Sequence, residues 1–279
     1  MSGCQDHFSL GLRWLRRWGE TRRGRGLGRR AGSLRSITLL AWLLIGVGLA
    51  LGPAAAQDRR QNQPGQFDFY VLALSWSPSF CDAAGERAAA RGERAQPTAE
   101  TQSGEGRRGA RPSAIQQQCG ERRYSFVVHG LWPQYEKGFP EFCEVPAPRL
   151  NRNIVSSMLD EMPSPRLIFR EWDRHGTCSG LGPRAYFDTI RKARAVVKIP
   201  APYLDVQSTL TVTPDEVEDA FVAANPGLTR AGVSVSCDSK RLSEVRICLT
   251  RDLGFRDCPE VGRRACRRDK LEMPPVRGG

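Results

Sequence analysis

The sequence predicts a mixed α+β domain that combines helices with a largely antiparallel sheet. Segments of strand-like composition lie near both ends of residues 57–279, and amphipathic helical segments lie between them. Eight cysteines in this region indicate covalent cross-linking of the domain. The region has 223 residues, enough for one sizeable hydrophobic core, and it shows no internal repeat.

Residues 1–56 are interpreted as an export signal and not as part of the fold. Nine arginines precede an apolar run of 15 residues, 37–51, and Ala54-Ala55-Ala56 follows it. Such a run is short for a membrane span, which needs about 20 residues. We expect cleavage after Ala56, which leaves one exported domain, periplasmic or secreted, without stable membrane association. A retained membrane anchor is the alternative.

The net charge of the domain is mildly positive. The full chain carries a formal charge of +12, of which nine arginines, Asp6 and Glu20 in the leader contribute +7, so +5 remains. A basic domain suits a polyanionic partner, but a solvated mixed surface fits this charge equally well. Charge alone therefore does not identify a substrate.

Cysteine usage indicates an oxidising compartment. Cys4 lies in the leader, and the remaining eight form an even set: Cys81, Cys119, Cys143, Cys178, Cys237, Cys248, Cys258 and Cys266. An even count behind an export signal is typical of disulfide bonding. A zinc site is the weaker interpretation, because the chain has no Cys-x-x-Cys pair. Counting does not determine which cysteines pair.

The first two segments of the domain differ sharply in composition. Residues 67–76 are rich in aromatic and branched side chains, which predicts a buried strand closed by Ser77-Pro78. Residues 83–114 contain no large apolar side chain. Such a stretch cannot offset its chain entropy by burial. We therefore expect a disordered insertion at 83–114, between Cys81 and Cys119.

A second short strand is predicted at residues 124–128. It would deliver His129 at its end, because glycine, tryptophan and proline follow at once. Loops at the ends of strands are common positions for reactive side chains. Residues 150–162 then have the apolar spacing of a helix that Pro163 stops.

Another helix is predicted over residues 166–176. On it Glu171, Arg174, His175 and Cys178 stand at positions i, i+3, i+4 and i+7, and all four would share one face. This spacing would gather an acid, a cation, an imidazole and an anchoring thiol.

The remaining elements follow from local patterns. Residues 183–197 form an amphipathic helix, and the capping box at 213–216 opens a helix that runs to about residue 224. Alternating apolar and polar residues predict strands at 233–237 and 245–249, tied down by the last four cysteines.

Two histidines follow the leader, His129 and His175. Two imidazoles can supply one proton donor and one proton acceptor near neutral pH. RNA carries its own nucleophile, so its cleavage needs a base that removes the 2′-proton and an acid that protonates the leaving 5′-oxygen. Arg174 could stabilise the charge that builds on phosphorus, and Glu171 could act as an acid or orient Arg174 or His175. The 2′-hydroxyl would select RNA over DNA.

Each of these features also has a purely structural interpretation. A single histidine at a strand end is usually a satisfied polar residue. Glu171 could merely pair with Arg174 or His175 on a helix surface. Trp132 and Trp172 could belong to the core. The conjunction of two histidines, each beside glycine and tryptophan, with an acid and a cation, favours catalysis.

Two segments resemble the active-site segments of the ribonuclease T2 family, secreted or vacuolar endoribonucleases that use no metal. They are residues 127–133 (VVHGLWP) and 170–178 (REWDRHGTC), and residues 70–81 (YVLALSWSPSFC) look like the first strand of that family. The likeness spans residues 67–81 and 119–266. It implies an α+β fold with a central antiparallel sheet flanked by helices, single-stranded RNA as the substrate and no metal or cofactor. We expect a monomer.

The resemblance also implies roles for individual residues. His129 would donate a proton to the leaving 5′-oxygen, His175 would accept the 2′-proton, and Glu171 and Arg174 would stabilise the transition state. The product would be a 2′,3′-cyclic phosphate, resolved to a 3′-phosphate. The implied disulfides are Cys81–Cys119, Cys143–Cys178, Cys237–Cys266 and Cys248–Cys258.

The chain departs from the family pattern at two cations. Position 174 is Arg where the family more often has Lys, and position 170 is Arg where some members have a histidine near the phosphate. The 83–114 insertion is also longer than expected. The candidate substrate-binding residues are Trp76, Trp132, Tyr135, Phe139 and Arg170, and base preference stays open.

Two other classes of function are compatible with the sequence. One is a secreted RNA-binding or interaction protein on the same scaffold, with catalysis weakened by the departures at 170 and 174. The other is a zinc hydrolase that uses Glu171, His175 and His129. The second is the least favoured, because no further ligand stands at zinc-ligand spacing.

Overall fold

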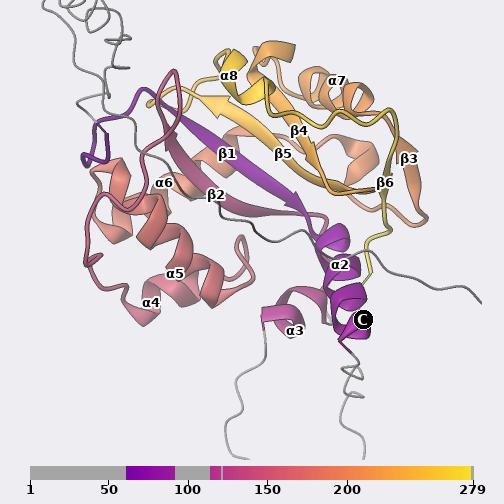
Figure 1. Cartoon of the computed structure of the whole chain (residues 1–279), viewed down its shortest axis with the longest axis horizontal. Helices are drawn as coiled ribbons and strands as arrows, with labels where there is room; N and C mark the ends of the chain where they lie inside the picture. Colours follow the sequence, from indigo (N-terminus) through magenta and orange to yellow (C-terminus); the bar gives the residue numbers. More distant parts are fainter. Residues whose placement is uncertain (1–60, 92–113, 121, 278–279) are drawn as a thin grey trace, which may run out of the picture. The chain divides into compact units, whose positions relative to one another are not determined.

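A computed structural model describes residues 61–91, 114–120 and 122–277 of the chain (Figure 1). The chain divides into two units, Met1–Ala56 and Gln57–Gly279, and the description concerns the second. The predicted export signal and residues 92–113 of the predicted insertion lie outside the described residues. Among the described helices, none is long and apolar enough to cross a membrane.

The centre of the domain is a four-stranded antiparallel sheet in the order β2-β1-β5-β4 (Figure 1). A separate two-stranded sheet pairs β3 with β6. The strands are β1 (Phe69–Trp76), β2 (Phe126–Gln134), β3 (Leu210–Val212), β4 (Val233–Cys237), β5 (Leu242–Leu249) and β6 (Leu271–Met273).

Helices lie around this sheet, so the predicted α+β class is confirmed. In Figure 1, α4, α5 and α6 lie on the side of β2, and α7 lies beside β4. The α-helices are α2 (Ser77–Ala90), α3 (Ala114–Cys119), α4 (Arg152–Ser157), α5 (Pro165–Arg174), α6 (Pro183–Val196), α7 (Pro214–Ala224) and α8 (Pro259–Gly262). The short 3₁₀ helices are η1 (Gly176–Ser179), η2 (Ala201–Tyr203) and η3 (Arg230–Gly232).

Strand β1 is buried along almost its whole length, as its apolar run predicts. Leu72 and Leu74 point into the main hydrophobic core, together with Trp172 and Tyr186 from the helices. Val71 points to the other face of the sheet, into a smaller cluster that includes the Cys248–Cys258 disulfide. One face of the sheet therefore holds the main core and leaves the other face available for a site.

Strand β2 differs from the prediction, which ended it at residue 128. It continues to Gln134 and contains Pro133, which an edge strand tolerates because one of its sides has no strand neighbour. Ala73 pairs with Gly130, and Leu74 pairs with Val128, so His129 is an extra residue in a β-bulge. The prediction that His129 lies at a strand end is wrong. The bulge, and not a loop, sets its direction.

The segment after β1 also corrects a prediction. Strand β1 ends at Trp76, so the predicted closure by Ser77-Pro78 is confirmed, but residues 77–90 then form α2, whereas the sequence predicted that disorder begins at residue 83. The prediction looked for large apolar side chains, but alanine favours helix through its backbone propensity. Pro78 stands in the first turn, where its missing N–H costs no hydrogen bond. The Cys81–Cys119 disulfide joins α2 to α3.

The predicted helix at 150–162 is shorter than expected. Asn151 caps α4, which ends at Ser157. Beyond it, the carbonyl of Glu161 accepts a hydrogen bond of 2.9 Å from the backbone N–H of Val128 in β2. This contact places the segment around Glu161 beside β2, so the segment does not continue the helix. The predictions for α6, for β4 and for the capping box of α7 are confirmed.

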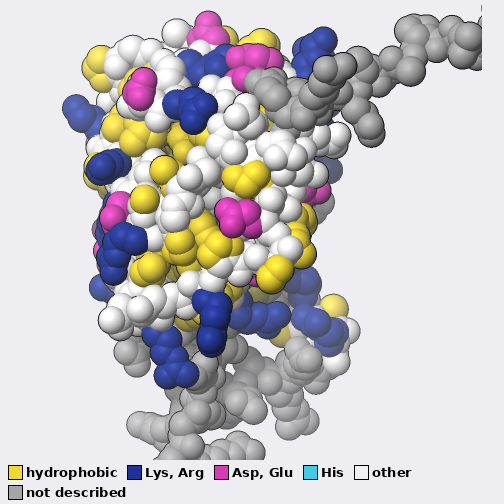
Figure 2. All heavy atoms as spheres, turned by 90° about the vertical axis from the view of Figure 1, so that its left-hand side faces the viewer, with side chains coloured by type: hydrophobic (Ala, Val, Ile, Leu, Met, Phe, Trp, Pro, Cys, Tyr) yellow, Lys and Arg dark blue, Asp and Glu magenta, His cyan; other side chains and the backbone are white. Residues whose placement is uncertain are grey.

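All four disulfides are those implied by the family resemblance. Cys143–Cys178 ties the loop after β2 to η1, which directly follows α5. Cys237–Cys266 ties the end of β4 to the loop after α8. On the face drawn in Figure 2, apolar side chains gather near the centre, and Lys and Arg lie mainly around the margin.

Candidate active site

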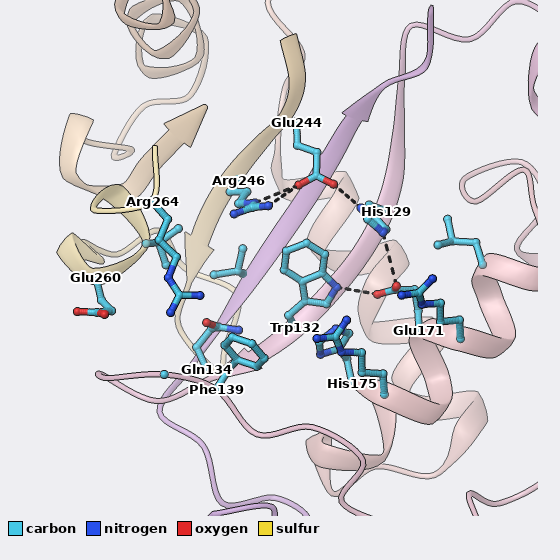
Figure 3. A pocket seen from close by; sticks show the side chains of 16 residues that line it. His129, Trp132, Gln134, Phe139, Glu171, His175, Glu244, Arg246, Glu260 and Arg264 are labelled. Atoms are coloured by element: carbon cyan, nitrogen blue, oxygen red, sulfur yellow. Dashed lines mark hydrogen bonds and ion pairs between the residues drawn. The ribbon is translucent and has the colours of Figure 1, made fainter. Parts of the chain in front are cut away.

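A cavity of about 370 Å³ brings most of the predicted site residues together (Figure 3). Its walls come from β1, β2, the loop after β2, α5, β5 and the region of α8. The lining residues are Val71, His129, Trp132, Gln134, Gly138, Phe139, Leu167, Arg170, Glu171, Arg174, His175, Glu244, Glu260, Val261, Arg246 and Arg264.

Helix α5 carries one carboxyl group and two arginines at the wall of the site. Ser164 caps the helix by accepting a hydrogen bond from the N–H of Leu167, and the helix ends at Arg174 with His175 at its C-cap. Glu171 and His175 are both buried, although charged and polar residues are rarely so without partners. The helix therefore holds both side chains at the wall of the cavity.

Glu171 joins the two predicted motifs. Its Oε2 accepts a hydrogen bond of 2.7 Å from Nε1 of Trp132, and its Oε1 lies 3.6 Å from Nε2 of His129 (Figure 3). Gly130 allows this approach, because a Cβ at that position would lie 2.3 Å from the Glu171 carboxylate. The close packing explains why glycine follows His129.

Glu244 on β5 holds the other side of the His129 ring. Nδ1 of His129 is in hydrogen-bond contact with Oε1 of Glu244. Arg246, two residues along the same strand, donates to Oε2 of Glu244 through Nε at 3.0 Å and Nη2 at 2.8 Å (Figure 3). The Glu244 side chain is only 11% exposed. A buried carboxylate thus links the histidine to an arginine.

The charges around His129 favour the protonated form of its ring. Burial alone would lower the pKa of His129, but the bond to Glu244 and the charges of Glu244 and Glu171 outweigh burial, so its pKa is raised above the ordinary value. Burial also opposes ionisation of Glu244, yet the contacts with His129 and Arg246 lower its pKa to about 2. An ionised carboxylate therefore faces a charged imidazole.

His175 experiences the opposite environment. Its ring lies 5.4 Å from the Trp132 ring and 6.3 Å from the Phe139 ring, between centroids. Burial, reinforced by the positive charges of Arg174, His129 and Arg170, lowers the pKa of His175 to about 3. Its Nδ1 is buried and makes no hydrogen bond with the described residues. The imidazole is therefore neutral near pH 7.

Glu171 itself titrates above its ordinary range. Burial raises its pKa, and the charge of His129 and the hydrogen bond from Trp132 offset this only in part. The carboxyl lies against the histidine that is held charged. The site therefore combines a protonated imidazole, a neutral imidazole and a buried carboxyl group.

The sequence predicted that Glu171 could orient Arg174, but in the structure Arg174 pairs with a different carboxylate. Its Nε donates at 2.7 Å to Oε2 of Glu141, in the loop after β2. The N–H of Phe142 also donates at 2.8 Å to the carbonyl of Arg174. The helix ends before Cys178, so the shared face of four residues is only partly formed. Arg174 still lines the cavity, with Arg170 beside it.

The predicted substrate-binding residues divide into two groups. Trp132, Phe139 and Arg170 line the cavity. Trp76 does not, because it is fully buried on the core face of β1 and its Nε1 donates at 3.1 Å to the carbonyl of Pro274. Tyr135 is also a core residue, and its hydroxyl accepts a hydrogen bond from the N–H of Asn62. These two predictions are wrong.

Glu244 and Arg246 are functional candidates that the sequence reasoning missed. The signal was partial, since Arg246 lies in the predicted strand 245–249 and Glu244 directly precedes it, where the two alternate with Val245 and Ile247. An exposed polar face explains such alternation equally well. In the structure the Glu244 side chain is buried and that of Arg246 is partly exposed, and the two form an ion pair.

The geometry is suited to paired proton transfers. The charged form is favoured for one imidazole and the neutral form for the other, which suits a proton donor and a proton acceptor in one cavity. Several arginines line the same cavity and can stabilise a developing anion. Among the described residues, no group of three or more His, Cys, Asp or Glu side chains is arranged to hold a metal ion.

Comparisons with known proteins were consistent with this geometry. A model of the Ribonuclease T2 family matches residues 67–258. A probable ribonuclease of Haemophilus influenzae is 32% identical over 146 residues, which cover 50% of this chain and 47% of that protein. A ribonuclease of Aeromonas hydrophila is 32% identical over 140 residues, which cover 50% and 51% respectively. The chain thus spans about half the length of these two curated relatives.

A solved structure of an RNase-related protein from Calystegia sepium is similar in fold. It superposes with a TM-score of 0.54 at 21% identity, over 76% of this chain and 98% of that chain. At this level of identity the similarity concerns the fold alone.

Proposed function

The chain belongs to the Ribonuclease T2 family, and from this we propose that it is an endoribonuclease that cleaves single-stranded RNA without a metal ion or cofactor. The observation that carries the proposal is the pair of histidines in one cavity, whose surroundings raise the pKa of His129 and lower the pKa of His175. Such a pair supplies the two proton transfers that RNA cleavage requires, and RNA provides the nucleophile itself.

In the first step, His175 accepts the proton of the 2′-hydroxyl. The 2′-oxygen attacks phosphorus, the bond from phosphorus to the 5′-oxygen breaks, and His129 donates its proton to that oxygen. The products are a 2′,3′-cyclic phosphate and a free 5′-hydroxyl. In the second step the roles are exchanged, and water opens the cyclic phosphate to a 3′-phosphate.

The assignment of donor and acceptor is supported by the two environments. A donor must be charged at the start, which agrees with the raised pKa of His129. An acceptor must be neutral, which agrees with the lowered pKa of His175. Because the donor has the higher pKa, His129 is protonated and His175 is neutral in most molecules at a pH between the two values.

Cations and Glu171 are proposed to stabilise the phosphorane. Arg174 and Arg170 line the cavity, and a guanidinium suits phosphate oxygens. Glu171 lies 3.6 Å from His129 and has a raised pKa, so its carboxyl group can hold a proton and donate a hydrogen bond to a phosphorane oxygen. Trp132 and Phe139 offer aromatic faces for a base.

Glu244 is proposed as a positioning residue. It would hold Nδ1 of His129, so that Nε2 faces the cavity and carries the transferable proton. Its charge favours the imidazolium, and Arg246 keeps the carboxylate ionised. A carboxylate behind a catalytic histidine serves the same purpose in other enzymes.

The proposed enzyme is a single exported domain. Residues 1–56 would be removed as a signal, and residues 57–279 would act in the periplasm or outside the cell. The four disulfides support an oxidising compartment.

Analysis of product ends tests the proposal. Purified protein is incubated with single-stranded RNA, and the ends are examined for 2′,3′-cyclic phosphate. The matched control is the same RNA with every 2′-hydroxyl methylated, which should stay intact. Cleavage of the methylated RNA would overturn the mechanism, and binding of the unmodified RNA without cleavage would favour a binding protein on the same scaffold.

A further inference from the structure

A second hollow adjoins the catalytic cavity. It has a volume of about 890 Å³ and is formed by the end of β4 and by residues 264–270, which follow α8. Arg264 lines both the hollow and the cavity. In Figure 3, Arg264 lies on the side of the cavity away from Glu171. A chain that leaves the cavity past Arg264 therefore reaches the hollow.

The hollow is strongly basic. Four cationic side chains line it against the single carboxylate of Asp269; they are Arg264, Arg267, Arg268 and Lys270. All four are exposed, and within the described part of the chain none forms an ion pair. Arg263, which does not line the hollow, pairs with Glu260 at 3.0 Å. The lining cations are thus available to an external anion.

The loop that carries these cations is anchored to the sheet. Cys266 forms a disulfide with Cys237, and its N–H donates at 2.7 Å to the carbonyl of Val235 in β4. Ser236, which also lines the hollow, places its hydroxyl 3.5 Å from Oε2 of Glu244. The loop is therefore fixed relative to the catalytic histidine, and binding there costs less ordering entropy than on a free loop.

We propose that this hollow is a second phosphate-binding site that takes the backbone of an RNA strand beyond the nucleotides in the catalytic cavity. The inference rests on the proposed function. Arginine suits phosphate, and the lining of the hollow contains no aromatic side chain on which a base could stack. The site would therefore hold RNA irrespective of sequence and favour long strands over dinucleotides.

Binding of an uncleavable RNA tests the site separately from catalysis. The probe is a single-stranded oligoribonucleotide with all 2′-hydroxyls methylated, and its dissociation constant is measured by fluorescence anisotropy over a range of salt. The test variant is Arg267→Ser with Arg268→Ser. The control is Arg184→Ser with Lys192→Ser, which removes the same charge from the exposed surface of α6.

We expect the test variant to weaken binding of the long probe several-fold and to reduce the salt slope by about 1.4, since each phosphate contact contributes about 0.7 for a single strand. The control should keep the wild-type slope. Equal losses of affinity in both variants would indicate an effect of net charge alone and would overturn the proposal. An unchanged salt slope in the test variant would overturn it as well.

Cleavage by the same proteins separates this inference from the proposed function. The test variant should cleave a ribodinucleotide at the wild-type rate and raise KM only for long RNA. If wild-type protein binds the methylated probe but cleaves no RNA, the proposed function fails while the site stands. Thermal melting of both variants verifies that the exposed substitutions leave the fold intact.

Discussion

Glu244 contacts Nδ1 of His129 from a separate strand, although 115 residues separate them in the chain. This contact opposes the burial of the imidazole and raises its pKa. Glu244→Gln removes the charge and nearly preserves the shape, so the pKa of His129 should fall. We expect the alkaline limb of the pH profile of kcat/KM to move to lower pH, with activity at pH 7.5 reduced roughly tenfold to a hundredfold.

A structural role for Glu244 would produce a different result. The control is Glu218→Gln, which changes another partly buried carboxylate paired with an arginine, Arg230, outside the cavity. That variant should keep the wild-type pH profile. Loss of activity in Glu244→Gln by the same factor at every pH would contradict a role in setting the pKa of His129.

The wild-type pH profile should be bell-shaped and broad. Activity requires neutral His175 and charged His129. It should therefore be lost as pH falls toward about 3, where His175 becomes protonated, and as pH rises through the raised pKa of His129. His129→Ala and His175→Ala should each lower kcat about 10²–10⁴-fold. A double variant no worse than either single one would show that the two act as a unit.

Arg174 should be replaceable by lysine but not by alanine. Its charge, and not its bond to Glu141, is the property that the phosphorane requires. We expect Arg174→Ala to lower kcat about 10²-fold and Arg174→Lys to retain most of the activity. Arg166→Ala, on the exposed side of the same helix, is the control in steady-state kinetics. Equal activity of Arg174→Ala and wild type would remove Arg174 from the site.

The two tryptophans among the predicted substrate-binding residues should respond in opposite ways. Trp76 is a core residue, so Trp76→Ala should reduce the free energy of unfolding by about 3–5 kcal/mol. Trp132→Phe should largely keep the stability but lose activity, because the hydrogen bond to Glu171 disappears. Urea unfolding and RNA cleavage measured on both variants would reveal any departure from this split.

Removal of metal ions should leave the activity unchanged. Proton transfers by two histidines and charge stabilisation by arginines need no Lewis acid. Cleavage rates measured after dialysis against EDTA should equal those before it. Recovery of a lost rate on addition of Zn²⁺ would instead support the zinc hydrolase.

Sequence patterns predicted the elements whose signals are local. The run of apolar residues in β1 and the capping box of α7 depend on neighbours within a few residues, and both are confirmed. His129, Glu171 and His175, which the family motifs pointed to, line one cavity in the structure, and their catalytic roles stay a prediction.

The remaining features depend on contacts between distant segments. The Glu244–His129 pair requires that β1 and β5 lie side by side, which no local pattern specifies. Burial of Trp76 depends on which face of β1 meets the helices, since both faces are apolar. Arg174 binds Glu141 because a disulfide brings the loop after β2 to the end of α5.

Because His129 lies in a bulge, the number of residues in β2 determines where its side chain points. Val128 and Leu131 both point into the core, although residues three apart in a regular strand point to opposite faces. The one extra residue allows Val128 and Leu131 to face the core together and turns the imidazole away from the core. Deletion of a single residue here would exchange the inner and outer sides of half the strand, so this stretch should vary by substitution and never by insertion or deletion.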